Sequence, residues 1–235
     1  MINVSRNGGL FMNIKGFKIN FLGDSITEGV GVVDKANCRY DKRLEKMCEI
    51  SKVNNYGIGG SRLAHQSKPS EKPRHDLCFC GRAYDMDKSA DMVVVYGGVN
   101  DYVHGDAPFG EIGDKTPATY CGAVYFLMKF LTETYAGKTV IFMTPAHCNY
   151  SNVDDLYPSP RAIKLPDAKP LLAYVEVIEE TAKQFSIPVL NLYRDLGIDT
   201  HDRELQAKYT SDGIHFNDDG HAILAEKLKE FIEAL

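Results

Sequence analysis

Short runs rich in apolar residues alternate along this chain with segments of helical spacing. Five runs have the length of a strand, at residues 18–22, 53–56, 92–96, 139–143 and 189–193. Continuous short runs bounded by turn residues are typical of strands buried on both faces. Strands that alternate with helices predict a parallel sheet with helices on both faces.

Three helices are well defined by the pattern. The first follows Thr116-Pro117, which resembles a cap with proline at the first helical position, and it ends at Gly137. The second occupies residues 167–185, and the third runs over 217–235. Each carries one apolar stripe at helical spacing, so each is expected to face the core rather than a cofactor.

The length of 235 residues suits one α/β domain. The chain has no internal repeat, no low-complexity segment and no linker between two cores. Residues 1–12 precede the first strand and are predicted to be a flexible N-terminal arm, which leaves residues 13–235 as the single domain.

Composition narrows the class of protein further. With 44% hydrophobic and 25% charged residues, the chain has the composition of an ordinary globular protein. Its net charge of −5 provides no positive electrostatic potential that would attract nucleic acid. No run of about 18 apolar residues could span a membrane, and the N-terminus lacks the apolar core of a signal peptide. We therefore expect a cytoplasmic protein with no membrane span, whose six cysteines are free thiols.

Three long irregular stretches follow predicted strands, at residues 61–87, 102–115 and 146–166. In an open parallel sheet the carboxyl ends of the strands form the ligand side, so these loops are expected to wall a binding site. Their polar residues are Arg62, His65, Arg74, His75, Arg82, Tyr102, His104, Asp106, His147, Asn149, Tyr150 and Arg161.

The stretch FLGDSITEGV places Ser25 directly after the first strand, but Gly-Asp-Ser alone is a common turn. Three other segments supply what a nucleophilic serine needs. NYGIGGS, residues 55–61, is a glycine-rich turn that can present a bare N–H, and GGVND, residues 97–101, carries the amide of Asn100. DGIH, residues 212–215, places a carboxylate three residues from an imidazole.

Each of these groups answers a chemical requirement of acyl transfer. A serine hydroxyl needs a base such as His215 to remove its proton, and a carboxylate such as Asp212 holds that base in the right tautomer. Negative charge on the carbonyl oxygen needs preorganised donors. The N–H groups of Ser25 and Gly60 and the amide of Asn100 could provide three.

The four blocks GDSIT, NYGIGG, GGVND and DGIH resemble, in order, blocks I, II, III and V of the SGNH hydrolases, the GDSL-like family of lipases, acylhydrolases and esterases. The resemblance covers residue 20 to the C-terminus, with isoleucine in place of the leucine of GDSL. It implies a flavodoxin-like three-layer α/β/α sandwich with about five parallel strands. Ser25 would be the nucleophile, His215 the base and Asp212 its partner. Gly60 and Asn100 would complete the oxyanion hole with Ser25.

The other candidate residues are given structural roles. Asp24 is interpreted as a turn-former, and Asp101 as a helix cap. The other histidines do not have the spacing of metal ligands. They are interpreted as residues on the surface or behind the site, and they are His65, His75, His104, His147, His201 and His221. No metal and no cofactor are implied.

Three rival functions are considered. A phosphate-binding module would need a Gly-Lys-Ser/Thr ending on the loop of residues 23–29 or Gly-x-Gly-x-x-Gly after a strand, and the sequence has neither. An α/β-hydrolase would need Gly-x-Ser-x-Gly, but Thr27 stands two residues after Ser25 in place of the second glycine. A non-catalytic domain on the same fold would be expected to have lost Ser25 or His215. The sequence therefore predicts a serine esterase acting on a small-molecule ester, with acetyl on a polar alcohol such as a sugar (a carbohydrate) as the expected substrate. A lipase or thioesterase for longer chains is the alternative, and the oligomeric state is left open.

Overall fold

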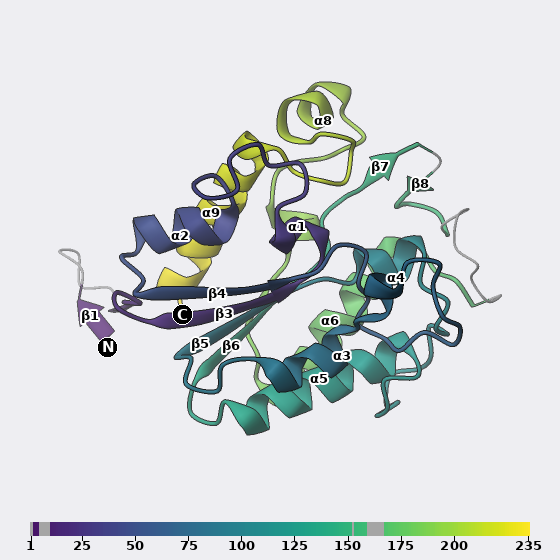
Figure 1. The fold of residues 1–235 in the computed structure, drawn as a ribbon, viewed down its shortest axis with the longest axis horizontal. Coiled ribbons are helices and arrows are strands. Elements are labelled where there is room, and N and C mark those ends of the chain that lie inside the picture. The colour runs from purple at the N-terminus through teal and green to yellow at the C-terminus, as the bar shows by residue number, and fades with distance from the viewer. Residues whose placement is uncertain (1, 5–9, 152, 159–166) are drawn as a thin grey trace.

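The computed structural model describes residues 2–4, 10–151, 153–158 and 167–235. Its centre is a sheet of five parallel strands: β3 (Lys18–Gly23), β4 (Lys52–Gly57), β5 (Met92–Tyr96), β6 (Thr139–Met143) and β9 (Val189–Leu190). The strand order is β4-β3-β5-β6-β9 (Figure 1). This is the flavodoxin-like order, in which the ligand side opens where the order reverses, here between β3 and β5.

Helices cover both faces of the sheet (Figure 1). On one face lie α2 (Tyr40–Met47) and α9 (Asp218–Glu233). On the other lie α3 (Phe79–Arg82), α5 (Tyr120–Thr134) and α6 (Leu171–Phe185). The predicted three-layer α/β/α sandwich with five parallel strands is therefore confirmed.

The alternation of side chains along β5 shows how the two layers form. Met92 and Val94 pack into the core under α2 and α9, whereas Val93 and Val95 pack into the core under α5 and α6. Successive side chains of a strand point to opposite faces, so a strand between two helical layers must be apolar throughout.

Short elements connect these layers, most of them after the carboxyl ends of the strands. The helices are α1 (Ser25–Glu28), η1 (Pro73–Asp76), η2 (Ala83–Asp85), α4 (Val99–Val103), α7 (Leu192–Asp195) and α8 (Arg203–Tyr209). The strands β7 (Asn149–Tyr150) and β8 (Val153–Asp154) form a small antiparallel pair. No helix in the described part of the chain is long and apolar enough to cross a bilayer.

Several predicted boundaries are wrong. α6 begins at Leu171, with Pro170 at the cap position, rather than at residue 167. α5 is capped by Thr119, whose side chain accepts from the N–H of Gly122, and not by Thr116. The carbonyl of Pro117 instead accepts from His65 N, so Pro117 belongs to a loop contact. The last strand ends at Leu190 rather than at 193, because the side chain of Asn191 caps α7 and the chain turns into a helix there.

The N-terminal arm contains a strand pair among its described residues. β1 (Ile2–Val4) pairs antiparallel with β2 (Leu10–Met12). Met12 also packs against the core under α2 and α9. The division into an arm of residues 1–12 and a domain of residues 13–235 stays a prediction.

Candidate active site

Ser25 is the first residue of α1, directly after β3. Asp24 caps this short helix, since its carboxylate accepts from the N–H of Ile26 at 3.0 Å. The role of Asp24 as a turn-former therefore agrees with the structure. The sharp change from strand to helix leaves the Ser25 side chain at the carboxyl edge of the sheet.

Gly57 at the end of β4 allows α1 to sit against the sheet. A Cβ at this position would lie 2.2 Å from the backbone nitrogen of Glu28, closer than any real contact. A glycine is required there because the backbone of the serine-bearing helix approaches so closely.

The structure brings Ser25, His215 and Asp212 into one hydrogen-bonded chain. His215 Nε2 lies 2.9 Å from Ser25 Oγ, and His215 Nδ1 lies 2.7 Å from Asp212 Oδ2. Asp212 Oδ1 also accepts from the backbone N–H of His215 at 2.8 Å. An imidazole placed between a hydroxyl and a carboxylate in this way can accept the hydroxyl proton.

The loop that carries Asp212 and His215 is fixed from two sides. Ser211 N donates to the carbonyl of His215, which closes the loop on itself. Asn149 N, in the loop after β6, donates to the carbonyl of Gly213 at 3.1 Å. Two segments far apart in sequence thus fix the position of Asp212 relative to His215.

Burial and hydrogen bonding act in opposite directions on the two aspartates of this region. Burial opposes ionisation of Asp212, but hydrogen bonds from the ring and backbone of His215 outweigh it and lower the pKa of Asp212. Asp24 is fully buried, and desolvation raises its pKa to about 6 although the Ile26 N–H favours the charged form. Asp212, the carboxylate beside His215, therefore stays ionised to lower pH than Asp24 does.

The glycines at residues 59 and 60 have different environments. The N–H of Gly59 donates to Glu28 Oε2 at 2.6 Å, so it is already engaged. The hydrogen bonds among the described residues leave the N–H of Gly60 without an acceptor. Gly60 has φ +76°, and a Cβ there would lie 2.3 Å from the ring of His75, which explains why only glycine fits.

Asn100 lies in α4 with 6% of its surface exposed. Its Nδ2 donates to the carbonyl of Ser61 at 3.1 Å, which leaves the second N–H of the amide for another acceptor. Its Oδ1 lies 3.1 Å from His104 Nε2, and His104 Nδ1 lies 2.8 Å from Arg62 NH1. A buried arginine and a histidine thus orient the amide.

The contact between His104 and Asn100 was missed by the sequence analysis. The sequence places His104 on the polar loop surface or behind the site, but does not say which residue it contacts. The two residues are four apart, which places them on one face of a helix, so predicting a helix here would have paired them.

Asp101 does not cap its own helix, contrary to the prediction. Gly98 is the residue at the cap position of α4. The carboxylate of Asp101 instead accepts from the backbone N–H groups of Leu63 and Ala64, at 2.9 and 3.0 Å. It therefore joins α4 to the loop that follows Gly60.

A pocket of about 420 Å³ is lined in part by His104, which contacts Asn100, and by His75, which lies next to Gly60. Its charged and imidazole-bearing lining residues are Arg62, Lys68, Glu71, Lys72, His75, His104 and Asp106. Burial, followed by the charge of Arg62, lowers the pKa of His75, so its ring is neutral at physiological pH. The prediction that Tyr102 forms part of the pocket wall is wrong, because this side chain is fully buried. Arg161, another predicted wall residue, lies outside the described residues.

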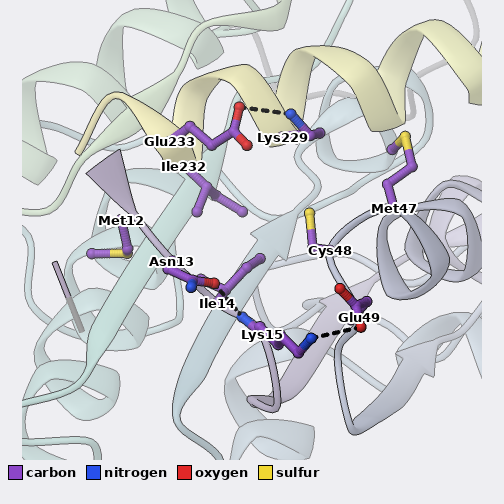
Figure 2. A pocket seen from close by; sticks show the side chains of 10 residues that line it. All are labelled: Met12, Asn13, Ile14, Lys15, Met47, Cys48, Glu49, Lys229, Ile232 and Glu233. Atoms are coloured by element: carbon purple, nitrogen blue, oxygen red, sulfur yellow. Dashed lines mark hydrogen bonds and ion pairs between the residues drawn. The ribbon is translucent and has the colours of Figure 1, made fainter. Parts of the chain in front are cut away.

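A second pocket, of about 390 Å³, lies at the opposite edge of the sheet (Figure 2). It is formed by the segment before β3, the end of α2 and the end of α9. Its charged groups pair with one another, Lys15 with Glu49 and Lys229 with Glu233. It contains none of the predicted site residues.

The remaining histidines have several environments. His65 is exposed, in agreement with its predicted place on the surface. His221 is fully buried and stacks on Tyr40, so a surface assignment is wrong for it. His147 and His201 meet at Asp155, which no sequence spacing indicated. All six cysteines are free thiols, as predicted.

Solved structures show the same fold over nearly the whole chain. A protein from Lactobacillus plantarum is 27% identical and covers 93% of this chain and 97% of its own, with a TM-score of 0.77. An acetyl xylan esterase is 19% identical, with a TM-score of 0.60, over 91% of this chain and 98% of its own. A two-domain esterase active on acetylated mannans is 19% identical, with a TM-score of 0.57, over 93% of this chain and 49% of its own.

Comparisons of sequence complete the assignment. Among curated proteins, no sequence matches this chain. The model of the GDSL-like lipase/acylhydrolase family matches residues 21–223, which include all four sequence blocks. The chain therefore belongs to the GDSL-like lipase/acylhydrolase family.

Proposed function

We propose that this protein is a serine esterase that removes a short acyl group, acetyl in the first place, from a polar alcohol such as a sugar. Ser25 is the nucleophile, His215 the general base and Asp212 its partner. The observation that carries this proposal is the continuous hydrogen-bonded chain from Ser25 Oγ through both nitrogens of His215 to Asp212.

In the first half-reaction Ser25 Oγ attacks the ester carbonyl while His215 Nε2 takes its proton. The carbonyl oxygen becomes an oxyanion, which the N–H groups of Ser25 and Gly60 and the amide of Asn100 stabilise. The tetrahedral intermediate then collapses. The bond to the alcohol breaks, and the imidazolium of His215 returns the proton to the departing alcohol oxygen, which leaves an acyl-enzyme.

In the second half-reaction water replaces the alcohol. His215 takes a proton from the water, whose oxygen attacks the acyl carbon and forms a second oxyanion at the same donors. Collapse breaks the bond to Ser25 Oγ, which recovers its proton from His215. The products are one alcohol and one carboxylic acid. Asp212 stays ionised throughout and stabilises the imidazolium, in keeping with its lowered pKa.

The charged side chains of the pocket near Asn100 support a hydrophilic substrate. Sites for long acyl chains are lined mainly by hydrophobic and aromatic side chains, whereas this pocket presents imidazole, ammonium and carboxylate groups. Phe79, the first residue of α3, is fully buried in the core and offers no apolar surface to a substrate. The names of two structural neighbours, a xylan and a mannan esterase, agree with an acetylated sugar, but likeness at that identity shows the fold alone.

Two other functions make different predictions. A lipase or thioesterase would turn over longer chains faster, and a non-catalytic binding domain would bind esters without hydrolysing them. The small-molecule substrate and a cytoplasmic location stay predictions.

The experiment is a panel of p-nitrophenyl esters from acetyl to palmitoyl, run beside acetylated mono- and oligosaccharides with wild type and Ser25→Ala. We expect kcat/KM to fall sharply beyond about four acyl carbons. Ser25→Ala should lower kcat by roughly 10³ or more with an unchanged circular dichroism spectrum. Rates that climb toward palmitoyl would favour the lipase, and a fully active Ser25→Ala would disprove the mechanism.

A further inference from the structure

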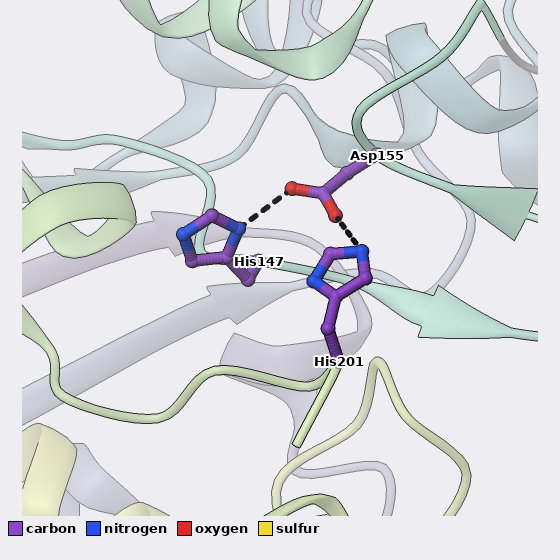
Figure 3. Close-up of side chains that lie close together, drawn as sticks. All are labelled: His147, Asp155 and His201. Carbon is purple, nitrogen blue, oxygen red and sulfur yellow. Dashed lines mark hydrogen bonds and ion pairs between the residues drawn. The ribbon is translucent and has the colours of Figure 1, made fainter. Parts of the chain in front are cut away.

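His147, Asp155 and His201 come together at the carboxyl edge of the sheet (Figure 3). His147 follows β6, Asp155 follows β8, and His201 precedes α8. His147 Nδ1 lies 2.8 Å from Asp155 Oδ2, and His201 Nε2 lies 3.1 Å from Asp155 Oδ1. One potential ligand atom from each residue lies within 4.8 Å of the others.

One carboxylate oxygen of Asp155 is buried without a hydrogen-bond donor among the described residues, which is unusual for a charged group. The side chain of Asp155 is completely buried, and its Oδ1 accepts no hydrogen bond from the described residues, although the carboxylate also hydrogen-bonds the side chain of Tyr193. The 3.1 Å separation from His201 Nε2 is an ion-pair distance, but the imidazole is aimed at Asp154 Oδ1 instead. A buried carboxylate oxygen without a donor is costly unless a cation compensates it.

The hydrogen bond at Nδ1 of His201 determines whether Nε2 of the same ring carries a proton. His201 Nδ1 lies 2.9 Å from Asp199 Oδ1, so it donates its proton there. In a neutral ring Nε2 then carries a lone pair, which faces the oxygens of Asp154 and Asp155. Lone pairs that face one another need either a second proton on the ring or a metal ion between them.

We propose that His147, Asp155 and His201 bind one divalent transition-metal ion, with Zn²⁺ as the best match. Two imidazoles and one carboxylate are a common zinc ligand set, and the mixture of nitrogen and oxygen ligands disfavours Mg²⁺ and Ca²⁺. A carboxylate on the far nitrogen of a ligating histidine, as Asp199 provides for His201, is the usual outer-shell partner of such sites.

The distances are compatible with an ion after small adjustments. Zinc bonds of about 2.0–2.1 Å in a tetrahedron separate neighbouring ligand atoms by roughly 3.3–3.4 Å. The two observed separations are 2.8 Å to Asp155 Oδ2 and 3.1 Å to Asp155 Oδ1, so the imidazoles would move away from the carboxylate by a few tenths of an ångström. His147 and His201 are both partly exposed, which gives the ion a path to the site.

The site would act as a structural clamp rather than in ester hydrolysis. It would join the loop after β6 to the segment that enters α8, and α8 leads into the loop of Asp212 and His215. It revises the expectation that no metal is implied, because the three ligands come from separate loops and match no sequence motif.

The rival explanation is a protonated His201. Burial disfavours a charged ring, yet hydrogen bonds to Asp199 and Asp154 raise the pKa of His201 overall. An imidazolium would satisfy the lone-pair argument without any metal. The experiment must therefore measure metal binding directly.

The test is calorimetric titration of Zn²⁺ into the full, tag-free chain after chelator treatment and dialysis at pH 7.5. We expect one site with Kd in the micromolar range or tighter. Asp155→Asn, which keeps the shape of the side chain, should weaken binding by at least tenfold, and so should His147→Ala. His65→Ala removes an exposed imidazole outside the cluster and should change nothing, and Mg²⁺ should not compete.

Two further readouts keep the result unambiguous. Free Zn²⁺ at a hundredfold excess over Kd should raise the melting temperature of wild type by roughly 5–10 °C, with a much smaller rise in either variant. Co²⁺ in the site should give visible absorption without thiolate charge-transfer bands. Absence of binding, binding that survives in both variants, or thiolate bands from the cysteines would each overturn the proposal.

Discussion

His104 holds the amide of Asn100 in one orientation. A guanidinium can only donate, so Arg62 NH1, at 2.8 Å, donates to His104 Nδ1. The ring therefore carries its proton on Nε2 and donates it to Asn100 Oδ1 at 3.1 Å. This contact fixes which end of the amide is oxygen and directs the Nδ2 donors toward Ser61 and the proposed oxyanion position.

We predict that His104→Ala lowers kcat by roughly tenfold with KM changed less than about twofold, since it loosens a donor used in the transition state. His104→Gln can still accept from Arg62 and donate to Asn100, and it should recover most of the activity. Steady-state kinetics on p-nitrophenyl acetate measures both.

The double variant tests whether His104 acts through Asn100. If it does, adding His104→Ala to Asn100→Ala should cost little more than Asn100→Ala alone, because the positioned group is already gone. Multiplicative losses would mean that His104 acts on the substrate or the fold instead.

Asn100→Ala itself should lower kcat by about 10²–10³ with a much smaller change in KM, as expected of a donor that works mainly in the transition state. Asn100→Asp keeps the shape but replaces the donor by an acceptor that carries charge, so it should be at least as damaging. A rise in KM at constant kcat would contradict the oxyanion role.

His215→Ala should lower kcat by roughly 10³ or more. The reduction in kcat caused by Asp212→Asn should be smaller than this by a factor of at least ten. The imidazole can still take a proton without its carboxylate, but its tautomer is no longer fixed and the imidazolium is no longer stabilised. Equal losses in the two variants, measured on one ester at one pH, would show that Asp212 does more than orient the ring.

The sequence predicted the layers of this fold because strands buried on both faces and amphipathic helices leave distinct patterns. Asn191 shows the limit of that reasoning. It lies within an apolar run that predicts a strand to residue 193, yet its side chain caps α7 and ends the strand. A local side-chain hydrogen bond decided the boundary, and apolar periodicity carries no information about it.

The proposed catalytic residues lie in sequence blocks and could be named from the sequence, whereas their supports could not. Asp101 was interpreted as a helix cap, but it binds the backbone of Leu63 and Ala64, nearly 40 residues away in sequence. Asp155 and His201 meet only because two loops fold over the same edge of the sheet. Contacts between loops depend on the tertiary fold, which a single sequence pattern does not specify.

His221 predicts how the stability of the protein responds to acid. The ring is fully buried between α9 and α2, where its Nδ1 accepts from Tyr40 N at 3.1 Å. Its Nε2 has no partner among the described residues. Burial lowers the pKa of His221 from 6.5 to about 4, so the folded chain resists protonation that the unfolded chain accepts readily.

The sign follows from proton binding. Between pH 6.5 and 4 the unfolded state holds more protons on His221 than the folded state, so this stabilisation is complete above pH 6.5 and is lost as the pH falls toward 4. His221→Asn keeps an acceptor for Tyr40 N but does not titrate. Between pH 7.5 and 4.5 the variant should therefore lose roughly 2–3 kcal/mol less unfolding free energy than wild type in urea titrations. Asp24 titrates in the same range in both proteins, so the difference isolates His221. Parallel losses in the two proteins would show that the ring is already charged, or not buried, in the folded state.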